Sequence, residues 1–189
     1  MSLTPNILPF THHLLRSSIR PGESVLDGTA GNGHDTLLLT ECVGAKGKVW
    51  AFDVQRQALA QTEARLADTG IRTQVEYVCA GHETLAEYID EPLAAAVFNF
   101  GWLPGGDKTL TTQADTSIRA LNAALMLLKP GGLLTAVLYP GHDAGYREAN
   151  AVEAWAADLP QRQYAVLKYS FINRKNRPPY LLAVEKLKV

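Results

Sequence analysis

Short apolar runs rich in β-branched residues alternate with longer helical patterns along the chain. Short runs bounded by turn residues are typical of strands, and the longer periodic stretches between them are typical of helices. The short runs predict seven strands at 24–27, 48–53, 74–79, 94–99, 133–139, 163–171 and 180–185. The longer stretches predict helices at about 9–18 and at 34–42, 55–69, 84–89, 113–128 and 144–158.

The order of these elements predicts the fold class. Strands that alternate with helices of this length form βαβ units, which build a parallel sheet covered on both faces. The last two strands are joined by residues 172–179 alone, too few for a helical crossover, so we expect an antiparallel pair. The chain is therefore predicted to form one α/β domain over residues 1–189. Its sheet should be doubly wound, seven-stranded and mostly parallel, with a C-terminal antiparallel hairpin.

Local sequence signals mark both ends of the helix predicted at 113–128. Thr112 is expected to cap its first turn, where Asp115 lies near the positive end of the helix dipole. The helix should stop at the sequence Lys129-Pro-Gly-Gly132, because proline and glycine do not continue a helix.

Composition narrows the class of protein. The 189 residues are 47% apolar and 20% charged, as in globular proteins and unlike disordered or collagen-like chains. The longest apolar run, Leu93 to Phe98, is far shorter than the roughly 20 residues of a membrane span, and no secretory signal is apparent. We therefore expect a cytoplasmic protein with no membrane contact. Cys42 and Cys79 form neither a disulfide framework nor a CxxC metal site, and both are expected to be buried, reduced thiols.

The net charge of −1 conceals an uneven distribution. Residues 161–189 carry seven basic side chains against one acid, Glu185, an excess of six, so the first 160 residues carry −7. A protein that binds polyanions over its whole surface would be basic throughout, but a local basic segment can still contact phosphates. A merely solvated surface explains the same residues equally well.

Polar residues follow several strand ends, where ligands bind in a doubly wound sheet. The sequence after the first strand is Asp27-Gly-Thr-Ala-Gly-Asn-Gly-His-Asp35, whose glycines allow a sharp turn and a close backbone approach to a ligand. The second strand ends at Asp53, whose carboxylate can accept hydrogen bonds from both hydroxyls of a ribose. The third strand is followed by Gly81-His-Glu83, which could hold an adenine edge.

The order of the glycines indicates which nucleoside cofactor fits. The dinucleotide pattern is G-x-G-x-x-G, whereas here two residues separate Gly28 from Gly31 and one separates Gly31 from Gly33. Asp27, ahead of the turn, would repel a pyrophosphate but could meet a cationic ammonium group. Asp27 followed by Gly31-x-Gly33 resembles the first motif of the class I S-adenosylmethionine-dependent methyltransferases, whose seven-stranded fold also ends in an antiparallel hairpin.

This resemblance implies S-adenosylmethionine as the cofactor. It places the methionine part on residues 27–33, the ribose on Asp53 and the adenine near residues 81–83. The residues predicted to contact the cofactor are Asp27, Gly28, Thr29, Gly31, Asn32, Gly33, Asp35, Asp53, Gln55, Gly81, His82 and Glu83.

A longer motif after the fourth strand narrows the resemblance. Asn99-Phe-Gly-Trp-Leu-Pro-Gly-Gly-Asp-Lys108 resembles the signature of a small bacterial family once labelled rRNA methylases and now understood as tRNA wobble methyltransferases. Tyr139-Pro-Gly-His142 and Asn173-Arg-Lys-Asn-Arg-Pro-Pro-Tyr180 match it too, so the motifs span nearly the whole chain. The resemblance implies methylation of the 5-aminomethyl group of 2-thiouridine in the anticodon stem-loop of tRNA. The motif is not the Asn-Pro-Pro-Tyr of adenine-N6 methyltransferases, because Phe100 and Gly101 replace the two prolines.

The same motifs supply candidate catalytic and substrate contacts. Asn99 offers a carbonyl acceptor that could orient the amine. His142 could take the amine proton, with Asp143 or Tyr139 nearby. Phe100 and Trp102 offer faces on which an unpaired uridine could stack. The predicted contacts to the anticodon loop are Lys108, Asn173, Arg174, Lys175 and Arg177.

Other readings of the sequence remain open. The segments Pro5-Asn-Ile-Leu8 and His12-His13 could cover the cofactor. No metal is expected, because neither histidine has a partner at ligand spacing. The acidic first 160 residues suit a methyltransferase that acts on a small-molecule or protein amine, and an rRNA substrate is a further alternative. An NAD-dependent oxidoreductase shares Asp53 and a glycine turn, and a non-catalytic binding module is a third class. A homodimer would extend the basic surface of so short a chain.

Overall fold

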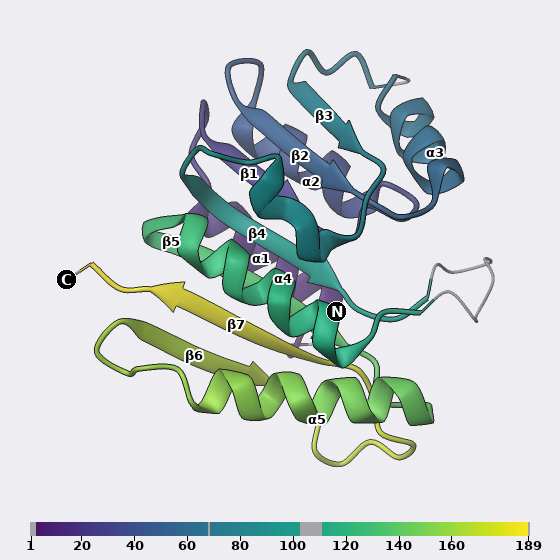
Figure 1. The fold of residues 1–189 in the computed structure, drawn as a ribbon, viewed down its shortest axis with the longest axis vertical. Coiled ribbons are helices and arrows are strands. Elements are labelled where there is room, and N and C mark those ends of the chain that lie inside the picture. The colour runs from purple at the N-terminus through teal and green to yellow at the C-terminus, as the bar shows by residue number, and fades with distance from the viewer. Residues whose placement is uncertain (1–2, 68, 103–110, 189) are drawn as a thin grey trace.

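The computed structural model describes residues 3–67, 69–102 and 111–188 (Figure 1). Seven strands form one sheet in the order β3-β2-β1-β4-β5-β7-β6. All neighbours run parallel except β7, which is antiparallel to both β5 and β6. The strands are β1 Ser24–Asp27, β2 Lys48–Phe52, β3 Gln74–Val78, β4 Leu93–Asn99, β5 Leu128–Leu138, β6 Tyr164–Tyr169 and β7 Tyr180–Lys186. The predicted fold class and its C-terminal hairpin are therefore confirmed.

Helices cover both faces of the sheet. They are α1 Ile7–Ser18, α2 His34–Val43, α3 Arg56–Ala67, α4 Ala114–Leu127 and α5 Asp143–Ala157, with the 3-10 helix η1 His82–Glu87. In Figure 1, α4, α5 and η1 lie in front of the sheet and α1 and α2 lie behind it. Phe98 and Leu134 pack with Leu121 of α4 in the front layer of the core, whereas Val25 and Val97 pack with the helices behind. The alternation of strand side chains produces these two layers.

Several element boundaries differ from the prediction, most of all the start of β5. Helix α4 ends at Leu127, just before the predicted stop sequence at 129–132. That sequence is part of a strand and not of a loop, because β5 begins at Leu128. The pairing with β4 shifts register between Leu93 and Ala95, which accommodates the irregular Pro-Gly-Gly segment. The helix expected at 84–89 is a 3-10 helix that begins earlier, at His82.

Three side chains also differ from the prediction. The N-cap of α4 is Gln113 and not Thr112, and it makes no side-chain capping bond. The hydroxyl of Thr112 is already used by Gly101 and Glu148. Cys79 is exposed and Cys42 is partly exposed, so the expectation of two buried thiols is wrong. Cys79 follows β3, an edge strand that has a neighbour on one side only.

The sheet has its topological switch point between β1 and β4. The chain leaves β1 for α2 behind the sheet and leaves β4 for α4 in front of it (Figure 1). Because the two connections diverge, a crevice opens beyond the carboxyl ends of these strands. In the described part of the chain, no helix has the length and apolarity to cross a membrane.

Candidate active site

A cleft of about 640 Å³ lies beyond the carboxyl ends of the parallel strands. It is lined by ten of the residues predicted to contact the cofactor: Gly28, Thr29, Gly31, Asn32, Asp35, Asp53, Gln55, Gly81, His82 and Glu83. The other two, Asp27 and Gly33, are buried beneath its wall. The structure therefore gathers segments that are far apart in the sequence around one cavity.

Two glycines of the first turn are required by packing inside the protein. A Cβ on Gly28 would lie 2.1 Å from the ring of Phe98, so no larger side chain fits between β1 and β4. Gly33 has φ +78° and begins α2 in a left-handed conformation, and a Cβ there would lie 2.8 Å from the backbone of Thr62. These glycines shape the turn through contacts with the protein itself, a reason that differs from the expected approach to a ligand.

Asp27 is a completely buried carboxyl group below the turn. Thr36 donates its hydroxyl to Oδ2 at 2.6 Å, and the backbone N–H of Thr29 donates to Oδ1 at 3.1 Å. Burial, reinforced by the charge of Asp35, raises the pKa of Asp27 from 3.8 to about 7. Asp27 therefore fixes the turn from below.

Asp53 ties the first turn to the end of β2. Its Oδ2 accepts the backbone N–H of Gly31 at 3.0 Å, and its Oδ1 accepts that of Gln55 at 2.8 Å. Each carboxylate oxygen retains a second lone pair, and the side chain lines the cleft. This arrangement leaves lone pairs that can accept hydrogen bonds from the hydroxyls of a ribose.

His82 lies at the opposite wall, at the start of η1. Its ring is edge-on to Phe98 and Phe100, with centroids 6.0 and 5.7 Å away. Burial lowers the pKa of His82, so the ring is neutral, and its Nε2 is buried with no hydrogen-bond partner among the described residues. An unpartnered ring nitrogen on the cleft is suited to a polar edge of a nucleobase.

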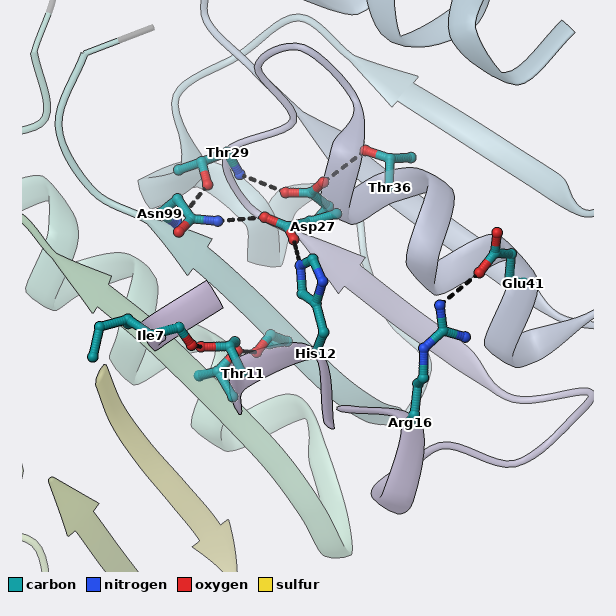
Figure 2. Close-up of polar contacts among 12 residues, drawn as sticks. Ile7, Thr11, His12, Arg16, Asp27, Thr29, Thr36, Glu41 and Asn99 are labelled. Carbon is teal, nitrogen blue, oxygen red and sulfur yellow. Dashed lines mark hydrogen bonds and ion pairs between the residues drawn. The ribbon is translucent and has the colours of Figure 1, made fainter. Parts of the chain in front are cut away.

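The carboxylate of Asp35 links Asn99 to α1. The amide Nδ2 of Asn99 donates to Asp35 Oδ2, and His12 Nε2 donates to Asp35 Oδ1 at 2.7 Å. The backbone N–H of Asn99 donates to Thr29 Oγ1 at 2.7 Å. Figure 2 shows Asn99 beside Thr29, with dashed lines that join Asn99 and His12 to the carboxylate between them. The remaining polar atom, Asn99 Oδ1, is buried and unpaired within the described residues.

His142 and Trp102 lie together on the cleft. Their ring centroids are 4.2 Å apart, and His142 caps α5 by accepting the backbone N–H of Gly145 at Nδ1, 3.1 Å away. Because Nδ1 is an acceptor, a neutral ring carries its proton on Nε2, which is buried and unpartnered within the described residues. This geometry favours hydrogen-bond donation by His142, in contrast to the expected acceptance of a proton.

The other predicted aromatic contacts differ in accessibility. Phe100 is 1% exposed and stacks on Phe98 at 5.4 Å, so it forms part of the cleft wall while belonging to the core. Trp102 is partly exposed and is better placed to receive a base. Tyr139 also lines the cleft, and burial raises the pKa of its hydroxyl, which therefore stays protonated at neutral pH.

The basic segment of the last hairpin does not line the cleft but borders it. The side chains of Asn173, Arg174, Lys175 and Arg177 are all exposed. The guanidinium of Arg177 lies 3.9 Å from the ring centroid of Tyr146, on the first turns of α5. Arg174 donates to Asn6 Oδ1 at 2.9 Å, which ties the segment to the start of α1. Lys108 lies outside the described residues.

Sequence reasoning missed several residues of the cleft. Thr111 and Thr112 return to it because Trp102 and Thr111 form an antiparallel bridge. Thr111 Oγ1 is buried and unpaired within the described residues. The only available signal was their position directly after the long fourth-strand motif. The predicted cover by the N-terminal segment is represented by Leu8 and His12, which both line the cleft.

Comparison with known proteins agrees with this geometry. Residues 49–185 match the family described as "Putative rRNA methylase". The chain belongs to this rRNA methylase family. A solved structure of a family protein from Clostridium thermocellum superposes with a TM-score of 0.96 at 37% identity, covering 98% of this chain and 100% of the other. A methyltransferase from Streptococcus mutans, solved in complex with SAH, gives a TM-score of 0.90 at 34% identity over 98% and 100% of the two chains.

One curated relative is named for its substrate. It is the chloroplastic tRNA (mnm(5)s(2)U34)-methyltransferase of Arabidopsis thaliana, 35% identical over 178 residues that cover 88% of this chain. The aligned region spans 65% of the length of that relative. Membership in the rRNA methylase family confirms the predicted class of S-adenosylmethionine-dependent methyltransferases and contradicts the alternative of an NAD-dependent oxidoreductase.

Proposed function

We propose that the protein transfers a methyl group from S-adenosylmethionine to a primary amine, the 5-aminomethyl group of 2-thiouridine at the tRNA wobble position. The product would be 5-methylaminomethyl-2-thiouridine. The name of the Arabidopsis relative supports this choice of substrate. The observation that carries it is the buried oxygen of Asn99, which has no partner among the described residues, in a cleft whose other wall suits a nucleoside.

The cofactor end of the cleft fits S-adenosylmethionine. Among the described residues, Asp53 keeps lone pairs for the ribose hydroxyls, and His82 Nε2 has no partner and can meet an adenine edge. The first turn, which Asp27 holds from below, would then bind the methionine part of the cofactor. When bound, the cofactor would supply a sulfonium methyl group to the amine nitrogen, with the sulfur leaving in line as a neutral thioether, so orientation of the acceptor would contribute much of the rate enhancement.

The other end of the cleft fits an amine on a base. Asn99 Oδ1 can only accept, so it can hold one N–H of a neutral amine and aim the nitrogen lone pair at the methyl carbon. Trp102 offers a face for the uridine ring, and the Nε2–H of His142 and the hydroxyl of Thr111 can bind its polar edge. His142 would thus position the base and would not act as the proton acceptor.

The exposed basic segment fits the rest of the substrate. Arg174, Lys175 and Arg177 follow β6 and border the mouth of the cleft near α5. Phosphates of an anticodon loop are the ligands that such a cluster attracts. The charge of −7 on the first 160 residues favours instead a small-molecule or protein amine, which is the second candidate substrate.

The test uses bulk tRNA from a strain that lacks the modification. The tRNA is incubated with the protein and S-adenosylmethionine and digested, and its nucleosides are measured by mass spectrometry. We expect 5-aminomethyl-2-thiouridine to gain one methyl group with the wild-type protein and much less with Asn99→Ala. No gain on any nucleoside, with the cofactor still bound in a calorimetric titration, would contradict the tRNA substrate and favour the small-molecule or protein amine.

A further inference from the structure

Asp35 has both carboxylate oxygens occupied by side chains of the protein. Oδ1 accepts from His12 of α1, and Oδ2 accepts from the amide of Asn99 at the end of β4. The sequence motif assigned Asp35 to the cofactor, since it closes the glycine-rich sequence that follows the first strand. Its contacts point along the cleft wall to Asn99, and its side chain is only 12% exposed.

The hydrogen bond to Asp35 determines which way the amide of Asn99 faces. The NH₂ group of Asn99 faces Asp35, because Nδ2 donates to the carboxyl oxygen Oδ2. Oδ1 then faces away from Asp35, where it is buried with no partner among the described residues. The backbone of Asn99 is fixed separately by its N–H bond to Thr29. Without the carboxylate, the amide could rotate and present NH₂, a donor, to the cleft.

We infer that Asp35 and His12 are positioning residues, which hold the amide of Asn99 with its carbonyl oxygen toward the substrate amine. This inference rests on the proposed function, which assigns an N–H of the substrate to that oxygen. His12 holds the carboxylate in place from the side opposite Asn99, at 2.7 Å. The N-terminal helix therefore acts on the reacting end of the cleft, through a residue of the cofactor motif.

The chain contains a matched control for His12. Arg16 lies one turn further along α1 and donates to Glu41 of α2 at 2.8 Å. Figure 2 shows both His12 and Arg16 reaching from α1 toward the segment that contains α2. Residues four apart share one face of a helix, so both pairs tie the same two helices together. Arg16 does not line the cleft, and its ion pair is exposed.

The first measurement compares His12→Ala with Arg16→Ala, using the substrate that the wild-type protein methylates. We expect His12→Ala to lower kcat about tenfold, because a charge-assisted hydrogen bond that orders the amide is lost. The cofactor Kd from calorimetry should change less than about twofold, and Arg16→Ala should leave both quantities near wild type. A fall in cofactor affinity as large as the fall in kcat would show that the His12–Asp35 pair acts on cofactor binding, and would overturn the inference.

The second measurement exchanges the two partners. Asn99→Asp alone places two carboxylates in contact, and we expect it to lower kcat by more than about tenfold. In the double variant Asp35→Asn, Asn99→Asp, the amide at position 35 can donate to the carboxylate at position 99. The second carboxylate oxygen at position 99 then faces the cleft. We expect it to recover most of the loss in kcat.

The outcomes separate this inference from the proposed function. If the wild-type protein methylates the amine but the exchange gives no recovery and His12→Ala behaves like Arg16→Ala, the positioning role is wrong and the function stands. If the wild-type protein methylates no tRNA amine, the function fails first. The exchange is then measured with the small-molecule or protein amine that the protein does methylate, and absence of recovery there also overturns the inference.

Discussion

At the scale of the residue, one buried carboxyl group has the largest consequence. Asp27 is completely buried under the turn that receives the cofactor, and burial raises its pKa to about 7. Two hydrogen bonds, from Thr36 and from the backbone of Thr29, lower the pKa of Asp27, but by less than burial raises it. A buried ionised carboxylate is unfavourable unless it is well paired, so the stability of the unliganded protein should depend on this group.

We predict that the unliganded protein loses stability as the pH rises from about 4 to about 7, relative to Asp27→Asn. The folded protein binds the Asp27 proton more tightly than the unfolded chain, for which the pKa is 3.8, so this stabilisation is complete below that value and is lost as the pH rises through the folded value. The full difference corresponds to at most about 4 kcal/mol. Urea unfolding of both proteins over this range measures it. A difference in unfolding free energy that is constant with pH would contradict the assignment.

At the scale of the element, α5 fixes the segment that follows β4. Glu148 of α5 is 3% exposed and accepts hydroxyl groups from Ser117 of α4 at 2.6 Å and from Thr112 at 2.9 Å. Thr112 in turn accepts the backbone N–H of Gly101 at 2.7 Å. One buried carboxyl group, whose pKa is raised by burial, therefore joins two helices to the wall of the cleft. The position of Trp102 depends on this element packing.

We predict that Glu148→Ala lowers the free energy of unfolding by about 2–4 kcal/mol, because it leaves two buried hydroxyls without their acceptor and a space between helices. Glu148→Gln keeps one acceptor oxygen and should lose less. Arg147→Ala, at an exposed position of the same helix, should change the value by less than about 0.5 kcal/mol. Denaturant unfolding at neutral pH measures all three. Equal values for Glu148→Ala and Arg147→Ala would show that the buried network contributes nothing.

At the scale of the whole molecule, charge is divided between the two ends of the strands. The basic segment Arg174, Lys175 and Arg177 borders the cleft beyond their carboxyl ends. Three other exposed bases precede β1, β2 and β3 and so lie at the opposite, amino ends of these strands: Arg20, Lys46 and Arg72. A polyanionic substrate should contact the first set and not the second, because the cleft of the described structure lies at the carboxyl ends of the strands.

We predict that replacing Arg174, Lys175 and Arg177 by alanine weakens tRNA binding and reduces the slope of log K against log salt by about two to three. The matched triple variant at Arg20, Lys46 and Arg72 should leave affinity and slope close to wild type. Fluorescence anisotropy at several salt concentrations measures both quantities, and calorimetry checks that the cofactor still binds. Equal losses for the two triple variants would mean that the contact is non-specific, and no loss for either would exclude this segment as the tRNA contact.

The sequence by itself determined the fold class, because the signals that define it are local. The alternation of strand and helix patterns, the short connection before β7 and the glycine-rich turn after β1 each arise within a few neighbouring residues. The strand-end positions of Asp53 and Asn99 followed from the same patterns. Boundaries were less well determined where local signals conflict, as at β5, where pairing with Leu93 extends the strand through a sequence that ends a helix.

Only the tertiary structure decided what each polar side chain does. Asp35 was expected at the cofactor, yet its partners His12 and Asn99 lie 23 and 64 residues away in the sequence. The tautomer of His142 depends on Gly145 bonding back to the ring, and Thr112 leaves its capping role because Glu148 and Gly101 compete for its hydroxyl. Hydrogen bonds of this kind depend on distances between segments, which packing of the whole chain sets and no local pattern contains.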